Sequence, residues 1–455
     1  MAGEGWRRLP IDHVKAPGAG AIAIGPFGSR MKSDRYEATG VPVIRGNNIS
    51  DTRALNGDFA FVSHATADEL RASNVFPGDL VFPHRGAIGR VGIVPSDGAP
   101  RYMLSTSLMK LTCDPAVVDP AFLFYFFRSG QGRHELLRNA STVGTPGIGQ
   151  PLASLRSITV PVPPTSDQRA IAHILGTLDD KIELNRRMNE TLEAIARALF
   201  KSWFVDFDPV RAKSEGRDVG LPPHLADLFP DSFEESELGE IPKGWPALAL
   251  ADCVDAARGL SYKGSGLSDS GKPMHNLNSI YEGGGYKPEG IKHYDGDHKS
   301  HHLARVGDVI VANTEQGHNR RLIGYAALVP GGVGDESLFS HHLYRLRPSG
   351  SCGLTPDYLC HLLNTGVMHD TVSGYANGTT VNMLPIDGVR RPLVVVPSSG
   401  IVRAFDGLAA AARLRHEKLI DESRTIAALR NTLLPKLISG ELRVADAERV
   451  VEAAL

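Results

Sequence analysis

Cysteine is scarce in this chain, and long apolar runs are missing. The 455 residues include four cysteines, Cys113, Cys253, Cys352 and Cys360, and no two of them form a CxxC pair. This pattern predicts buried thiols in a reducing compartment rather than a disulfide framework. The longest aromatic and apolar run, residues 121–127, is too short to span a membrane. The first ten residues lack the apolar core of a signal peptide, so we expect a cytoplasmic protein.

An excess of charge of one sign is also absent. The net charge is −2, with 49 Lys/Arg and 51 Asp/Glu. Residues 1–165 contain 17 basic and 13 acidic side chains, whereas residues 206–243 contain 4 and 10. Composition alone therefore does not indicate a nucleic-acid-binding protein. The length predicts two or more domains.

Motifs that would indicate catalysis are incomplete. Residues 266–273, GLSDSGKP, imitate a phosphate-binding loop around Lys272, but Pro273 replaces the hydroxyl that should bind Mg²⁺, so we predict a surface turn. No glycine-rich cofactor loop follows a strand, and no Asn/Asp-Pro-Pro-aromatic sequence is present for amino-group methylation. Ten histidines between positions 275 and 369 match no zinc spacing. We expect no catalytic residues, metal site or cofactor in this chain; a stand-alone nuclease or nucleotide hydrolase is the weaker alternative.

The chain is a tandem repeat of two long units. PGDLV (77–81) matches VGDVI (306–310) at an offset of 229, and IGRVGIVP (88–95) matches IGYAALVP (323–330) at 235. DPAFLFYFF (119–127) matches TPDYLCHLL (355–363) at 236. A chance similarity would not keep its offset so nearly constant over several blocks. We place the small insertions between the blocks in surface loops.

Each repeat has the pattern of an α+β unit. β-branched segments bounded by Gly, Pro and Asp predict short strands. These segments are PVIRG, DLVFP, VGIVP and SITVPVP in the first repeat and DVIVAN, AALVP, LYRLRP and RPLVVVP in the second. A helix should follow Pro120 and Pro356, because proline suits the first helical turn.

A long helix follows each globular unit. Apolar residues recur every 3.5 residues in both helices, which predicts that they pack against each other, antiparallel, with the globular units at opposite ends. Polar residues, including Lys181 and Asn185, interrupt the seam and should fix its register. Pro435 should end the second helix. The predicted seam comprises Ile171, Ile174, Leu178, Asn185, Met188, Leu192, Ile195 and Leu199 in the first helix and Ile401, Phe405, Leu408, Leu419, Ile426, Leu429 and Leu433 in the second.

These patterns predict a division of the chain into six parts. They are globular units at 1–165 and 244–397, spacer helices at 166–205 and 398–437, a loop-rich acidic and proline-rich linker at 206–243, and a tail at 438–455. From this organisation alone, a coiled-coil adaptor without a DNA role remains an alternative.

Polar, glycine-broken loops are the candidate DNA-binding surfaces. Arg and Lys can contact phosphates or guanine, and Asn and Gln can pair with adenine. The candidates in the first repeat are Arg30, Lys32, Arg35, Arg45, Asn47, Asn48, His84, Arg85, Arg90 and Thr145. Those in the second are Tyr262, Lys263, Asn276, Asn278, Gln316, His318, Asn319, Arg320, Arg321, Asn377 and Thr379.

The segments that frame the repeats resemble a known family. They are GWRRLPIDHV at the start, VPVPPTSDQRAIAHILGTLDDKIELNRRM in the centre, LGEIPKGWPALALAD before the second unit and LRNTLLPKLISGEL near the end. Together they resemble a specificity subunit of a type I restriction–modification system.

The resemblance implies a function for the whole chain. Residues 1–165 and 244–397 would be target-recognition domains that each read one half of a split double-stranded DNA sequence. The helices would set the gap and bind two methyltransferase subunits, and restriction subunits would join the complex. S-adenosylmethionine, ATP and Mg²⁺ would bind the partner subunits, and this chain would be non-catalytic.

Overall fold

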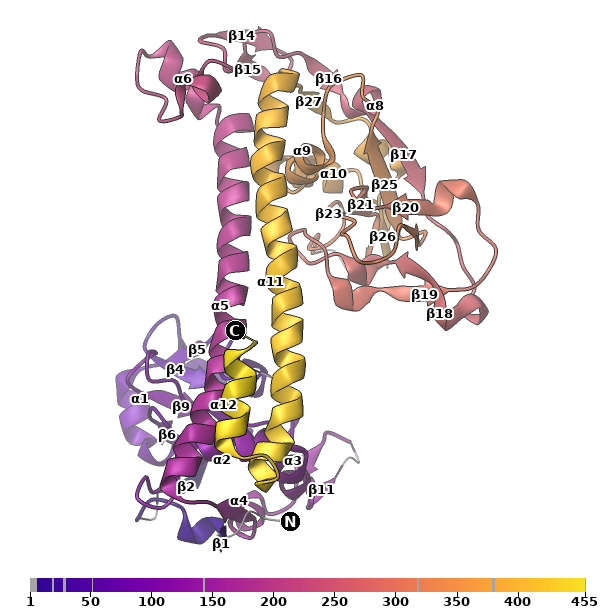
Figure 1. Cartoon of the computed structure of the whole chain (residues 1–455). Helices are drawn as coiled ribbons and strands as arrows, with labels where there is room; N and C mark the ends of the chain where they lie inside the picture. The colour runs from indigo at the N-terminus through magenta and orange to yellow at the C-terminus, as the bar shows by residue number, and fades with distance from the viewer. Residues whose placement is uncertain are drawn as a thin grey trace. The chain divides into compact units, whose positions relative to one another are not determined.

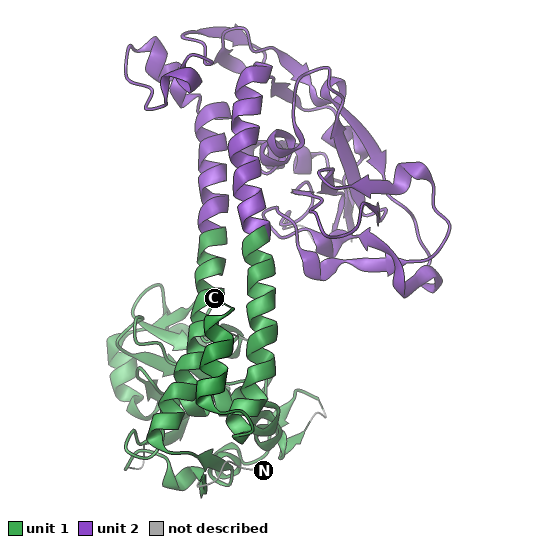
Figure 2. Ribbon diagram, in the orientation of Figure 1, with its two compact units in different colours: residues 1–189, 418–455 green, residues 190–417 purple. Residues whose placement is uncertain are grey.

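A computed structural model of the chain describes residues 6–18, 20–27, 30–50, 52–141, 144–316, 319–378 and 381–454. The chain forms two compact units (Figure 2). Unit 1 comprises residues 1–189 and 418–455, and unit 2 comprises residues 190–417. Two long helices, α5 (Thr165–Phe204) and α11 (Ser399–Ser439), each contribute to both units. The α+β class with two long helices is confirmed.

Two sheets and a buried helix organise unit 1 (Figure 1). The first sheet has the order β2 (Ile22–Ile24), β10 (Leu108–Leu111), β7 (Leu80–Pro83) and β8 (Gly92–Ile93). The second has the order β3 (Tyr36–Glu37), β5 (Ala60–Val62), β4 (Val41–Ile44), β9 (Tyr102–Leu104) and β6 (Asn74–Val75). Helix α2 (Pro120–Arg128) is capped by Asp119, and its residues 122–127 are all buried in the core. The Phe82 and Phe127 rings lie 5.0 Å apart, joining the first sheet to α2.

Unit 2 repeats this plan. Its first sheet has the order β17 (Val254–Arg258), β25 (Leu343–Pro348), β21 (Val309–Ala312) and β23 (Ala326–Leu328). Its second has the order β19 (Lys292–Tyr294), β18 (Leu267–His275), β24 (Glu336–Phe339) and β20 (Leu303–Arg305). Helix α9 (Pro356–Leu363) is capped by Thr355 and precedes α10 (Gly366–Gly374). The helices predicted after Pro120 and Pro356 are therefore confirmed.

Short elements complete both units. In each repeat a strand near the start pairs with the last strand: β1 (Arg7–Pro10) with β13 (Thr159–Val162), and β16 (Ala247–Ala249) with β27 (Leu393–Val395). All eight segments predicted as strands contain one. The remaining helices and strands outside the linker and tail are α1 (His64–Glu69), α3 (Gly130–Leu137), β11 (Ala140–Ser141), β12 (Gly147–Ile148), α4 (Pro151–Arg156), α8 (Leu250–Cys253), β22 (Thr314–Gln316) and β26 (Val381–Met383).

The change from proline-rich strand to helix is held by one buried glutamine. Gln168, in the first turn of α5, is fully buried. Its Nε2 donates to the carbonyl oxygen of Pro163 at 2.8 Å, and its Oε1 accepts from the backbone N–H of Asp119 at 2.7 Å. One side chain therefore ties the last strand of the unit, the start of α2 and the start of α5 together.

The long helices are antiparallel within each unit. In unit 1, Asn185 Nδ2 donates to Glu422 Oε2 at 3.0 Å, and six residues earlier on α5 Asp179 pairs with Arg430. In unit 2 the Phe200 and Phe405 rings lie 5.3 Å apart. The numbering falls along one helix as it rises along the other, which confirms the predicted antiparallel pairing.

Of the 15 predicted seam residues, nine are buried and four are partly buried, whereas Ile195 and Leu408 are exposed. Ile195 is 58% exposed, whereas its neighbour Ala196 is 9% exposed. On α11, Leu408 is likewise exposed and Ala409 is buried. Beyond Leu178, successive inward-facing positions of α5 lie four and then three residues apart. The predicted seam had the opposite order, three and then four. A straight helix has 3.6 residues per turn and drifts against a 3.5-residue repeat, so the apolar positions at the start do not fix the later ones.

This register predicts opposite results for two adjacent lysine substitutions. Ala196→Lys should lower the free energy of unfolding by roughly 2–3 kcal/mol, because it forces a charge into the helix pair. Ile195→Lys should change it by less than about 0.5 kcal/mol, as for an exposed position. Urea unfolding of both variants checks this. A larger loss for Ile195→Lys would favour the original frame.

Helix α11 continues beyond the predicted end. Pro435 lies inside the helix, so the prediction that it ends the helix is wrong. Near the C-terminus a proline removes only one backbone hydrogen bond of the helix, and the buried Leu437 and Ile438 hold the last turn in the core of unit 1. Gly440, with φ of 73°, terminates the helix in the left-handed conformation that glycine adopts readily. The tail then forms α12 (Val444–Glu452).

The linker is folded, contrary to the loop-rich expectation. It contains α6 (Asp208–Ser214), α7 (Pro223–Ala226) and the hairpin of β14 (Phe233–Ser236) with β15 (Gly239–Pro242). Phe207 and Phe229 are buried in the core of unit 2, where the Phe229 ring lies 5.1 Å from that of Trp203. These aromatic contacts explain why a proline-rich, acidic segment still orders.

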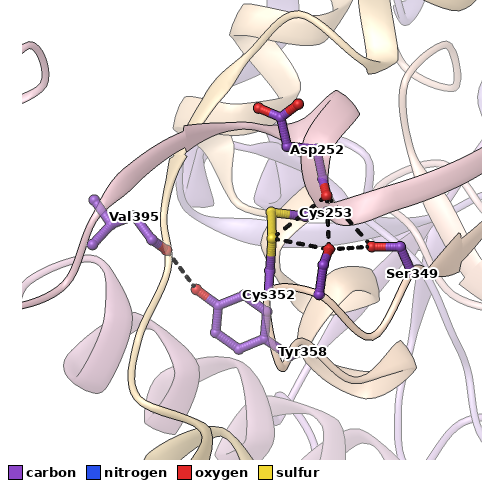
Figure 3. The surroundings of a disulfide bond; sticks show 7 residues. Asp252, Cys253, Ser349, Cys352, Tyr358 and Val395 are labelled. Atoms are coloured by element: carbon purple, nitrogen blue, oxygen red, sulfur yellow. Dashed lines mark hydrogen bonds between the residues drawn. A yellow bond between two sulfur atoms is a disulfide. The ribbon is translucent and has the colours of Figure 1, made fainter.

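Two further predictions need correction. Residues 267–273 belong to β18, not to a surface turn, and the Lys272 ammonium lies 3.6 Å from the Glu336 carboxylate. Cys253 and Cys352 form a disulfide beside hydroxyls of the 349–351 turn (Figure 3). Their separation of 99 residues concealed this proximity. Cys113 and Cys360 are buried free thiols, as predicted. Among the described residues, the helices are all too short or too polar to cross a bilayer.

Candidate nucleic-acid interface

Three loop segments meet in unit 1. The backbone N–H of Gly86 donates to the carbonyl of Pro146 at 2.8 Å, and Arg85 forms a backbone bridge with Gly147. Arg90 Nη1 donates to the carbonyl of Ile49 at 3.0 Å. The loop that follows β7 therefore contacts both the segment after β4 and the segment before β12. These are the loops in which the sequence predicted DNA contacts.

Exposed side chains of these loops could approach DNA. Arg85, Asn47 and Thr145 are exposed, and the Arg45 guanidinium lies 5.0 Å from the centre of the Tyr36 ring. Arg30, Lys32 and Arg90 are also exposed. Arg35 pairs with Glu69 at 2.8 Å, which places a carboxylate beside this cation.

Unit 2 brings the corresponding segments together. Strand β22 pairs with β26 through Thr314, Glu315 and Gln316, which face Met383, Asn382 and Val381. The backbone N–H of Gly283 donates to the carbonyl of Arg321 at 3.4 Å, so the segment after β18 also contacts the loop that follows β22. The same three parts of each repeat thus converge in both units.

The polar groups of this surface in unit 2 are mostly exposed. Lys263, Asn278, Gln316, Asn319, Arg320, Arg321 and Asn377 are exposed. The Arg321 guanidinium lies 3.8 Å from Glu282. Tyr262 accepts a hydrogen bond from Lys292 Nζ at 3.3 Å. Burial, with the neighbouring His341, lowers the pKa of His342, whose Nδ1 pairs with Thr314 Oγ1 at 2.8 Å.

Three predicted contacts are instead used inside the fold. Asn48 is fully buried, and its Nδ2 donates to the carbonyl of Asn56 at 2.8 Å. Asn276 is buried with its Nδ2 bound to the carbonyl of Gly290. His84 is buried beside the carbonyl of Thr106, and burial lowers its pKa. Polar residues in such loops resemble contact residues in sequence, yet these three satisfy buried backbone groups.

Sequence reasoning missed two anchoring residues. Asn313 is 2% exposed, and its Nδ2 donates to the carbonyl of His341 at 3.0 Å. Asn313 occupies the place that His84 has in the first repeat. The backbone N–H of Asn313 donates to the carbonyl of His342, and that of His84 donates to the carbonyl of Ser107. Glu315 accepts from three successive backbone N–H groups, those of residues 321–323. The sequence feature that could have indicated them is an insertion: the offset between the repeats rises by six residues, from 229 to 235, at this loop.

His318 and Thr379 lie outside the described residues. Within the described ranges, no group of three or more His, Cys, Asp or Glu side chains is arranged to hold a metal ion. The other exposed candidates remain predictions.

Part of the chain matches a known protein family. Residues 27–194 match the type I restriction modification DNA specificity domain. Over these residues the chain is similar to this specificity family. The match begins after β2, includes β3 to β13 of unit 1 and extends through most of α5.

Specificity subunits of type I restriction enzymes are similar to this chain over segments of different length. The specificity subunit of the type I restriction enzyme HindI from Haemophilus influenzae is 34% identical over 206 residues, which are 44% of this chain and 44% of that protein. The chain thus matches less than half the length of that relative. The MjaIX specificity subunit from Methanocaldococcus jannaschii is 25% identical over 390 residues, 82% of this chain and 79% of that protein.

A solved structure shares the fold of this chain. The crystal structure of a type I restriction–modification system S subunit from M. genitalium aligns with a TM-score of 0.54 at 14% identity. The alignment covers 95% of this chain and 96% of that chain. At this identity the comparison bears on the fold.

Proposed function

We propose that this chain is the DNA-reading specificity subunit of a type I restriction–modification complex. The observation that carries the proposal is the duplication of one loop cluster, with exposed cations and amides, in two units of a chain that matches the DNA specificity domain. Each unit would read one half of a bipartite double-stranded target. Amide and guanidinium groups supply the donors that distinguish bases in the major groove.

The proposal assigns the chemistry to partner subunits. Two methyltransferase subunits and the restriction subunits would assemble on this chain, and S-adenosylmethionine, ATP and Mg²⁺ would bind to those partners. This chain would position them on DNA without reacting itself. The near-neutral net charge of −2 supports a need for partners, because cation-driven attraction to phosphates would be weak in the isolated chain.

Selection from a DNA library tests the proposal. The full chain, assembled with its methyltransferase subunits, is incubated with duplexes that contain two random blocks separated by variable gaps. We expect enrichment of two fixed blocks at one gap length. Enrichment of one continuous motif, or of two blocks at every gap length, would contradict it. Mg²⁺-dependent cleavage by the isolated chain, lost in Lys272→Ala, would instead favour the nuclease alternative.

Arg85 should contribute to DNA affinity by contacting a phosphate or a base. We expect Arg85→Ala to weaken binding of the assembled complex to its target several-fold. If the guanidinium contacts a phosphate, the slope of log K against log salt should fall by about 0.9. Arg156→Ala is the matched control. Arg156 lies on α4, outside the candidate loops, and its guanidinium is 3.7 Å from the carboxylate of Asp12. Fluorescence anisotropy over a salt series measures both quantities, and equal effects of the two variants would count against a role for Arg85.

A further inference from the structure

We propose that the β22–β26 ribbon of unit 2 enters the major groove and reads an A·T base pair through the 5-methyl group of thymine. This inference rests on the proposed function and adds the base class that unit 2 recognises. A two-stranded ribbon fits the major groove, which is about 12 Å wide. The ribbon pairs Thr314–Gln316 with Val381–Met383 in antiparallel register.

One face of the ribbon is exposed and carries two kinds of side chain. Val381 and Met383 are 42% and 44% exposed, and between them Asn382 points to the buried side. Gln316 lies directly opposite Val381, and Asn377 forms a backbone bridge with Met383. Both amides are exposed. The exposed face therefore combines two apolar side chains with two amides.

This combination matches the groove edge of an A·T pair. In the major groove, thymine presents a methyl group, and adenine presents an acceptor and a donor that an amide can bind together. A G·C pair has no methyl group there, so it would leave Val381 and Met383 against polar edges. Arg320, in the loop that follows β22, is exposed and adds a cation of the kind that contacts backbone phosphates.

Hydrogen bonds on the buried side and at the base of the ribbon stabilise its conformation. Glu315, on its buried side, accepts from the N–H groups of Arg321, Leu322 and Ile323 at 3.0, 3.4 and 3.3 Å. At its base, the carbonyl of Asn313 accepts from the N–H of Leu384 at 2.8 Å. A preorganised surface loses less entropy when it binds. In unit 1 the described residues of the matching loops are joined by the backbone bridge of Arg85 with Gly147, and six fewer residues lie in the first loop.

The test compares thymine with uracil, which differs only by lacking the 5-methyl group. The target is first defined by the library selection with the assembled complex. Each dT in the two half-sites is then replaced by dU, and binding is measured for the wild-type complex and for Val381→Ser, Met383→Ser and the double variant. We expect one dT in one half-site to give roughly fivefold or greater loss on replacement in the wild type, the low end for a base-specific contact.

The variants should lose this preference, so that their affinities for dT and dU become equal. Because the readout is a ratio within each variant, a general loss of folding would not imitate it. Val367→Ser, at an exposed position of α10, is the matched control and should keep the wild-type ratio. In a selection with Gln316→Ala, only the half-site that contains the sensitive dT should change.

The outcomes separate the two proposals. A bipartite target in which no dT is sensitive, or in which the serine variants keep the wild-type ratio, would overturn the ribbon inference and leave the proposed function standing. A selection without any bipartite target would overturn the proposed function, and the ribbon inference with it.

Discussion

Replacing Asp179 by alanine should unfold unit 1 far more easily than any exposed substitution on the same helix. The Asp179 carboxylate is buried on α5 and accepts from Arg128 Nη1 and from the hydroxyl of Tyr125, both at 2.9 Å. It also pairs with Arg430 of α11. Without the carboxylate, two largely buried guanidinium groups lose their shared counter-charge. The cost of breaking a buried pair is roughly 3–5 kcal/mol.

The neighbouring residue supplies the control. Asp180 pairs with Arg53 at 3.7 Å, but its side chain is 71% exposed. Water screens such a pair, so Asp180→Ala should cost less than about 1 kcal/mol. Urea unfolding gives the free energies, and hydrogen exchange assigns them to unit 1 through peptides of α2 and α5. Similar losses for the two variants would show that the buried network contributes little.

Unit 2 should lose stability in mild acid. Burial lowers the pKa of His275 to about 4 and that of His361 to about 4. His275 lies between Ser337 Oγ at 2.7 Å and the Tyr286 hydroxyl at 3.1 Å. The His361 ring stacks on Phe200 at 5.7 Å. Both sites hold the neutral ring, so protonation is disfavoured in the folded state.

The direction of the pH effect follows from these values. In the unfolded chain a histidine has a pKa near 6.5, so below that pH the unfolded state binds more protons than the folded state. Stability should therefore be constant above about pH 7 and fall between pH 6.5 and pH 4. Between pH 7 and pH 5 each histidine should contribute a loss of roughly 2 kcal/mol.

Urea unfolding at pH 7 and pH 5 measures this loss. His275→Gln and His361→Leu should each reduce the difference between the two pH values, and the double variant should reduce it further. His224→Gln, at an exposed position of α7, should leave the difference unchanged. A pH difference that survives in the double variant would assign the acid sensitivity to other groups.

The framework of the fold could be predicted because it depends on local patterns. Strands such as β7 and β21 are β-branched runs beside turn residues, and Pro120 and Pro356 begin helices for a local steric reason. The frame of the helix seam could not be derived in full. Whether Ile195 or Ala196 faces inward depends on a small angular drift that accumulates along α5. The larger apolar side chain, Ile195, is the exposed one.

The candidate interface was predictable by segment but not by side chain. Within each unit the structure brings candidate segments together, at the loop of Arg85 in unit 1 and at that of Gln316 in unit 2. Asn47 and Asn48 are adjacent and chemically identical, yet one is exposed and the other is fully buried. Their difference arises from backbone carbonyls more than seven residues away in sequence, such as that of Asn56, which local patterns do not reveal.

The division of both long helices between the units has a consequence for synthesis on the ribosome. The core of unit 1 includes Ile426, Leu437 and Val451, which are translated after every residue of unit 2. Unit 2 needs nothing beyond residue 417. The C-terminal unit can therefore complete its core before the N-terminal unit does, a delay of a few seconds at roughly 5–20 residues per second. During that interval the apolar surface of unit 1 lacks its contacts with the end of α11. A ribosome that stalls between residues 417 and 451 would therefore hold a chain in which unit 2 is complete and unit 1, although begun first, is not.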